Sequence, residues 1–139
     1  MSLNIKRRKR ARFHAIQAIY QFSIVDISST ELKKQFYKDN VLRHIVEWNF
    51  FNTLVSGVIK NIKNIDLQIG KFAKNNLDSI SIINLALLRL GTLEIIYFLD
   101  IPYQVIFKEY VLQAKNLGTE KSYSLVNGVL NSMAKKFRT

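Results

Sequence analysis

The 139-residue sequence contains no cysteine. This absence excludes a disulfide scaffold, a zinc site built on thiolates and a cysteine nucleophile. Proline occurs once, and the five glycines are scattered, so neither a phosphate-binding loop nor a dinucleotide-binding turn is present. The longest uncharged runs, such as residues 13–25, have 13 residues. A membrane-spanning helix needs roughly 20 apolar residues, so we expect none.

Targeting signals are also lacking. A basic start precedes an apolar stretch, as in a signal peptide, but that stretch carries His14, Gln17 and Gln21. No small-residue cleavage site follows it, so we do not expect a signal peptide. The absence of cysteine fits a reducing compartment. We therefore expect a cytoplasmic protein that does not bind membranes.

Patterns typical of catalysis or metal binding are missing too. The two histidines, His14 and His44, fall in different predicted helices and have no partner at metal-ligand spacing. No two carboxylates stand at a spacing that suggests shared acid–base work. We therefore expect a protein that is not an enzyme and that holds neither a metal ion nor a cofactor.

Positive charge is what the chain has in excess, with 21 Lys and Arg against 10 Asp and Glu and a net charge of +11. Six of these cations form what we term the basic run: Lys6, Arg7, Arg8, Lys9, Arg10 and Arg12. Arginine outnumbers lysine 4 to 2 in the run, whereas lysine outnumbers arginine 12 to 3 elsewhere. Arginine adds bidentate phosphate contacts and stacking, so the run predicts a polyanionic ligand.

The position of the basic run indicates how it would bind. Cations at a helix start oppose the helix dipole, at a cost of about 0.3–1 kcal/mol each. We therefore expect residues 1–12 to form a basic arm that is frayed alone and ordered by its ligand. Arginine-rich helices bind irregular RNA, and no leucine heptads of a DNA-binding zipper follow. RNA is the favoured ligand; a solvated tail or a localisation signal is the alternative.

The apolar residues repeat at helical spacing almost throughout, and no strand alternation is found. We expect an all-helical fold of about six helices. The first ends near Asp26, and Ser28 followed by Glu31 is a candidate capping box for a short second helix. The others cover residues 51–72, 79–98, 102–118 and 125–137. The helix over 79–98 is apolar on most sides, so we expect it to be buried, and Gly118 is the expected C-terminal cap of the helix over 102–118. A break near residues 75–78, with Asp78 as an N-cap, would divide the single domain 1–139 into two small lobes.

Two further features concern helix packing. Gly91 and Gly128 lie inside predicted helices, where each costs about 1 kcal/mol relative to alanine. Close approach of another helix would explain both glycines. Lys135, Lys136 and Arg138 lie at the end of the last helix, where cations interact favourably with the helix dipole.

Residues 7–137 resemble the NusB family of bacterial transcription antitermination factors at several places in the same order. The matching segments are the basic run leading into residues 15–20, residues 87–90 with Glu94, residues 100–105 with Glu109, and residues 118–122 leading into 126–130. The resemblance implies a two-lobed helical protein that binds boxA RNA as a heterodimer with NusE, a small-subunit ribosomal protein. The pair would join NusA, NusG and RNA polymerase, and a homodimer is also compatible with the family.

Positions carried over from the family provide candidate site residues. The RNA contacts would be Arg7, Arg8, Lys9, Arg10, Arg12, Lys121, Ser122 and Tyr123. Tyr20 and Asn84 match the region that meets NusE. Asn84 stands where the family commonly has an acidic residue, and Leu125 replaces a common aromatic residue. These departures bear on the NusE contact and on the RNA surface, respectively.

Two alternatives remain at this point. A NusB-like domain also precedes the catalytic domain of an rRNA cytosine methyltransferase family, where it would deliver RNA. We expect no methyltransferase region, given the length of this chain. The other alternative is a generic basic domain that binds nucleic acid or a membrane surface.

Overall fold

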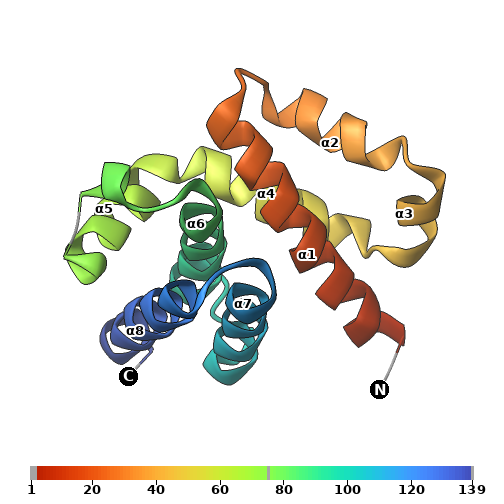
Figure 1. Ribbon diagram of the computed structural model, residues 1–139. Coiled ribbons are helices and arrows are strands. Elements are labelled where there is room, and N and C mark those ends of the chain that lie inside the picture. The colour runs from red at the N-terminus through yellow and green to blue at the C-terminus, as the bar shows by residue number, and fades with distance from the viewer. Residues whose placement is uncertain (1–2, 75, 139) are drawn as a thin grey trace. The chain divides into compact units, whose positions relative to one another are not determined.

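A computed structural model of the protein describes residues 3–74 and 76–138. Within these residues the chain forms eight α-helices and one short 3-10 helix, with no strand (Figure 1). The all-helical prediction is confirmed. None of the described helices is long and apolar enough to cross a membrane. The chain divides into two compact units, residues 1–60 and 61–139, termed the N-terminal and C-terminal units.

The N-terminal unit contains four helices, α1 (Leu3–Ile24), α2 (Ser29–Tyr37), α3 (Asn40–Ile45) and α4 (Trp48–Lys60). Helix α1 packs against α4 and α2, and α2 also packs against α4 (Figure 1). The buried apolar side chains of this unit include Ala15, Ile16, Ile19, Leu32, Phe51, Leu54, Val55 and Val58. This core holds the helix that carries the basic run.

Local capping sets two of these helix starts. The predicted N-cap Ser28 is confirmed, because its side chain accepts a hydrogen bond from the Glu31 N–H at 3.1 Å. Asp39 caps α3 by accepting from the N–H groups of Val41 and Leu42. Helix α3 was not predicted, because its six residues bury no side chain and leave no apolar period in the sequence.

The helix predicted over residues 51–72 is two helices, α4 and α5 (Ile62–Ala73). They are interrupted at Asn61, where the two units also divide. Apolar residues are spaced three and four positions apart on both sides of the interruption, because α4 and α5 each bury an apolar face in their own unit. Periodicity alone therefore did not reveal the boundary.

The break expected near residues 75–78 falls inside the C-terminal unit, and residue 75 lies outside the described residues. A short 3-10 helix, η1 (Leu77–Ser79), occupies this connection, with Asn76 as its N-cap. Helix α6 begins after Ser81, whose Oγ accepts from the Asn84 N–H at 3.3 Å. Ser81 is thus the N-cap of α6, and the prediction of Asp78 was wrong.

The C-terminal unit is organised around α6 (Ile82–Tyr97), which packs against α5, α7 (Tyr103–Leu117) and α8 (Glu120–Phe137). Most of α6 is buried, as predicted. A Cβ on Gly91 would lie 2.9 Å from Leu130 Cδ2, which confirms close approach of α8 there. A Cβ on Gly128 would meet nothing within 4 Å, so the same explanation is wrong for Gly128.

Arg138 connects the last helix to the end of α6. It follows α8, and its guanidinium donates to the carbonyl oxygens of Glu94, Ile95, Phe98 and Ile101 at 2.8–3.1 Å. These carbonyls belong to the C-terminal end of α6 and the turn after it, where helices run out of regular backbone donors. Those of Glu94 and Phe98 also accept from the N–H groups of Phe98 and Ile101, respectively, so Arg138 adds a second donor to each. Arg138 therefore caps α6, a role that its position in the sequence does not indicate.

Candidate nucleic-acid interface

The basic run lies within α1, which is helical from Leu3 onward. The Arg7 guanidinium donates to the Val46 carbonyl at 3.1 Å, and the Glu47 N–H donates to the Arg7 carbonyl at 3.2 Å. These contacts attach the start of α1 to the segment between α3 and α4. They offset the unfavourable helix dipole, so the expectation of a frayed arm is wrong for residues 3–12.

Two arginines of the basic run pack on the same aromatic ring. The guanidinium carbon of Arg8 lies 4.4 Å from the centre of the Phe50 ring, and that of Arg12 lies 4.9 Å from it. Both contacts are cation–π interactions. Arg12 is only 4% exposed. Its predicted RNA contact would require the side chain to leave Phe50, so the structure gives Arg12 a role in packing.

Apart from the buried Arg12, the cations of the run face solvent to different extents. Lys6 and Arg10 are exposed, whereas Arg7, Arg8 and Lys9 are half-buried. The run therefore separates into anchoring arginines and exposed cations on one preformed helix. Sequence spacing alone did not reveal this separation.

The second predicted RNA group, Lys121, Ser122 and Tyr123, lies in the first turn of α8 in the C-terminal unit. Lys121 is exposed, and Tyr123 is half-buried with the Lys115 ammonium 5.0 Å from its ring centre. Lys115 belongs to α7 and was not predicted. The surface here thus offers one lysine beside an aromatic ring and a second, exposed lysine in the same turn of α8.

Ser122 differs from its neighbours because it is 4% exposed and holds the start of α8. Its hydroxyl accepts from the Thr119 N–H at 3.1 Å, and its own N–H donates to the Thr119 hydroxyl at 3.3 Å. This reciprocal pair is a capping box. The geometry therefore gives Ser122 a role in capping, beside any contact with RNA.

Gly118 is the predicted C-terminal cap of α7, which the structure confirms. Its φ angle is −128°, so the position does not require a left-handed backbone. A Cβ would instead lie 2.3 Å from the Ser122 hydroxyl oxygen. Glycine is needed here because the capping serine packs directly against the backbone.

A pocket of about 670 Å³ brings Asn84 together with Lys121 and Ser122. Asn84 is 9% exposed, and within the described residues its Oδ1 is buried without a hydrogen-bond partner. A residue predicted to bind a protein partner therefore shares one hollow with residues predicted to bind RNA. Tyr20, the other predicted partner contact, is 40% exposed on α1 in the N-terminal unit.

The two histidines show no arrangement typical of catalysis. Burial lowers the pKa of His14 below its usual 6.5, and a hydrogen bond with Gln17 and the charge of Asp39 partly offset this effect. A lowered pKa keeps His14 neutral near pH 7. Among the described residues, no group of three or more histidine or acidic side chains is placed to hold a metal ion.

Comparison with known proteins adds independent information. The NusB family model matches residues 9–135. The transcription antitermination protein NusB of Stenotrophomonas maltophilia K279a is 36% identical over 131 residues, which cover 94% of this chain and 82% of that protein. The crystal structure of NusB from T. maritima aligns with a TM-score of 0.80 and 27% identity, covering 95% of this chain and 93% of that one.

A second solved chain, from a crystal structure described as a plectonemic RNA supercoil, also aligns with a TM-score of 0.80 and 27% identity. The alignment covers 94% of this chain and 96% of that chain. The prediction of a protein without enzymatic activity agrees with these relatives. The family model and the relatives both extend over nearly the whole chain, and on this ground the chain belongs to the NusB family of transcription antitermination proteins.

Proposed function

We propose that this chain is a cytoplasmic RNA-binding antitermination factor, which binds boxA RNA together with NusE and joins NusA, NusG and RNA polymerase. Family membership supports this proposal, and so does the RNA crystal structure that contains a chain of the same fold. The observation that carries it is the basic run on α1. Lys6 and Arg10 are exposed on a helix that Arg7, Arg8 and Arg12 hold in place.

This arrangement favours RNA binding through preorganisation. A frayed arm would lose conformational freedom on binding, and this entropic cost would reduce affinity. Helix α1 is already fixed by the hydrogen bond from Arg7 to Val46 and by stacking on Phe50. The exposed cations can therefore contact phosphates without first ordering the backbone.

A second surface would extend the contact with RNA. Lys115 places a cation 5.0 Å from the Tyr123 ring centre, and Lys121 is exposed in the same first turn of α8. Aromatic rings next to cations suit single-stranded RNA, because a base can stack while the backbone is neutralised. The pocket beside Asn84 and the exposed ring of Tyr20 would meet NusE.

The mechanism that we propose is assembly. One protein that binds both RNA and NusE raises the effective concentration of each near the polymerase, so weak contacts become sufficient. Such a role requires surfaces that bind at the same time. The basic run and the partner surface at Asn84 use different residues, which is compatible with simultaneous binding. The second RNA surface, in contrast, shares Lys121 with the pocket of Asn84, so RNA and NusE would meet there.

The test is a titration of labelled boxA RNA and scrambled RNA, each with and without NusE and at two salt concentrations. We expect a preference for boxA that strengthens when NusE is present. The double variant Lys6→Ala/Arg10→Ala should bind more weakly, with the salt dependence reduced by about 0.7 per lost phosphate contact. The matched control is Lys60→Ala/Lys71→Ala, which removes two exposed lysines away from α1.

Equal binding of both RNAs without a response to NusE would contradict the boxA function. An equal loss in the control and in the α1 variant would show that only the overall charge matters. The second result would contradict the specific role of the basic run.

A further inference from the structure

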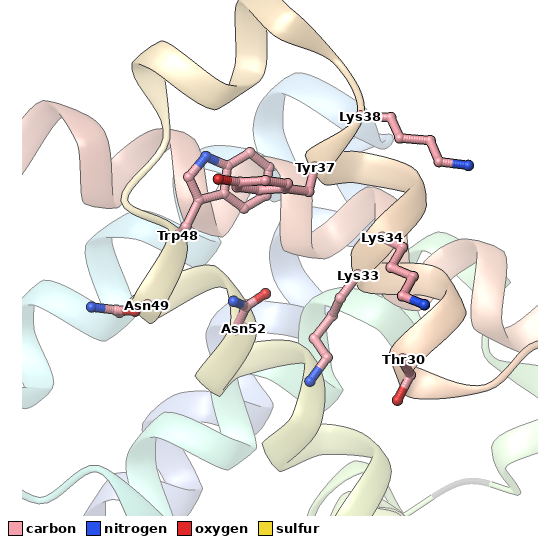
Figure 2. Close-up of a pocket in the computed structure, with 8 residues that line it drawn as sticks. All are labelled: Thr30, Lys33, Lys34, Tyr37, Lys38, Trp48, Asn49 and Asn52. Carbon is pink, nitrogen blue, oxygen red and sulfur yellow. The ribbon is translucent and has the colours of Figure 1, made fainter.

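A second basic and aromatic surface lies in the N-terminal unit, between α2 and α4. It is a pocket of about 570 Å³. Its lining residues are Thr30, Lys33, Lys34, Tyr37, Lys38, Trp48, Asn49 and Asn52 (Figure 2). None of these residues belongs to the sites predicted from the sequence. We term this pocket the Trp48 pocket.

The charge of the Trp48 pocket favours an anion. Lys33, Lys34 and Lys38 come from α2 and its C-terminal end, and none of the described lining residues is acidic. Lys34 and Lys38 are exposed, while the Lys33 ammonium donates to the Ser56 hydroxyl at 2.9 Å. Three cations around a hollow, without a carboxylate lining it, produce a local positive potential.

The aromatic side of the pocket is rigid and partly open. The Tyr37 and Trp48 ring centres are 5.1 Å apart with the rings at 74°. Trp48 Nε1 donates to the Arg43 carbonyl at 3.1 Å, and the Arg43 guanidinium lies 5.1 Å from the centre of the Tyr37 ring. Tyr37 nevertheless remains 48% exposed. A flat ligand could stack here without reordering the side chains.

Polar groups complete the pocket. Figure 2 shows Asn52 on the α4 side, between Trp48 and Lys33, whereas the Asn49 side chain points away from the lysines of α2. Each amide carries a carbonyl acceptor and an NH₂ donor, the combination that hydrogen-bonds to the edges of bases. Lysines alone would suit an acidic peptide equally well. The open aromatic ring and the Asn52 amide favour a nucleobase attached to a phosphate backbone.

We propose that the Trp48 pocket binds a nucleotide of single-stranded RNA. Its base would lie against Tyr37 and Trp48, with the adjacent phosphates near Lys34 and Lys38. This proposal rests on the proposed function, because RNA is the ligand in both, and it adds a second RNA subsite to the N-terminal unit.

The pocket is separate from the basic run. Trp48 and Phe50 are two residues apart, which places them on nearly opposite sides of α4. Phe50 contacts Arg8 and Arg12, whereas Trp48 lines the pocket. A short RNA can therefore occupy the pocket alone, and a longer strand would pass around the first turn of α4 to reach both.

The test uses the intrinsic fluorescence of Trp48, the only tryptophan in the sequence. The full chain is titrated with a single-stranded RNA hexanucleotide, and the emission of Trp48 is followed. We expect saturable quenching. The variant Lys34→Gln/Lys38→Gln should weaken it severalfold, whereas the control Lys60→Gln/Lys71→Gln should not. Tyr37→Ala should weaken it at least about fivefold, the lower end of a base–aromatic stack.

Tyr37→Phe keeps the ring and should retain binding, which separates stacking from the role of the hydroxyl. Circular dichroism of each variant checks that the helices are intact, and the two glutamine variants change only exposed side chains. The proposal is overturned by an absence of saturable quenching, by an equal loss in the control, or by equally tight binding of oligoglutamate. The last result would identify an acidic peptide as the ligand.

A parallel anisotropy titration with labelled boxA RNA separates this proposal from the proposed function. BoxA binding that depends on Lys6 and Arg10, without a Trp48 response to the hexanucleotide, would overturn only the pocket. A Trp48 response without a preference for boxA would support the pocket and contradict the boxA function.

Discussion

At the scale of single residues, the basic run has two roles. Arg12 is buried against Phe50, while Arg10, two residues earlier, is exposed. The same residue type therefore contributes to folding at one position and is available to a ligand at the other. Alanine substitutions can separate the two roles.

We predict that Arg12→Ala lowers the free energy of unfolding by about 1–2 kcal/mol, because it removes a desolvated cation–π contact. Arg10→Ala should change it by less than about 0.5 kcal/mol, as is typical of exposed positions. Denaturant titrations monitored by circular dichroism measure both values. Equal stabilities of the two variants would contradict the assignment of Arg12 to packing.

A second residue-scale prediction concerns pH. The pKa of His14 is lowered by burial, so the folded state disfavours its charged form. The unfolded chain takes up this proton as the pH falls through about 6.5, and unfolding becomes more favourable below that pH. The free energy of unfolding should therefore decrease on going from about pH 7.5 to about pH 5.5.

The variant His14→Gln isolates this contribution, because all other titrating groups stay the same. Its stability should fall less over the same pH range. Parallel pH profiles for the original chain and the variant would contradict the prediction.

At the scale of elements, the two helical glycines differ in what surrounds them. Gly91 on α6 faces the Leu130 side chain of α8, whereas Gly128 on α8 faces open space. Only the first glycine allows two helices to approach closely. The second carries the helix-propensity cost of glycine without this benefit.

We predict that Gly128→Ala raises the free energy of unfolding by about 1 kcal/mol. Gly91→Ala should be the less stable of the two variants, because its new methyl group would displace Leu130. Thermal denaturation of both variants provides the comparison. A more stable Gly91→Ala would show that α6 and α8 are not closely packed at this point.

At the scale of the whole molecule, the two units have separate cores. The C-terminal unit has its own fully buried side chains, including Ile65, Ile69, Leu87, Leu90 and Leu130. It also has its own polar connections, such as the bidentate pair of Arg89 and Asp66 at 2.9 Å. Each unit therefore contains the contacts that a small domain needs.

We predict that a fragment of residues 61–139 folds by itself and unfolds cooperatively on heating. A fragment of residues 1–60 is near the size at which buried surface only just balances chain entropy, and it should be marginal. Circular dichroism melts of both fragments and of the full chain test this. A disordered 61–139 fragment would contradict the independence of the C-terminal unit.

The NusB resemblance, the all-helical class and several helix ends were predictable because they depend on local information. Apolar spacing, the N-cap Ser28 and the C-cap Gly118 are properties of short segments. Helix α3 and the division at Asn61 were not predictable. Helix α3 buries no side chain, and the division at Asn61 interrupts an apolar repeat whose spacing continues from α4 into α5.

The sequence by itself determined the helical class, the family and the presence of a concentrated positive charge. Only the tertiary structure decided which cations anchor α1, which face solvent and which residues form the Trp48 pocket. Charge and the spacing of apolar residues can be read directly along the sequence. Burial, stacking on Phe50 and the meeting of α2 with α4 depend on contacts between segments far apart in sequence, and no local pattern encodes those contacts.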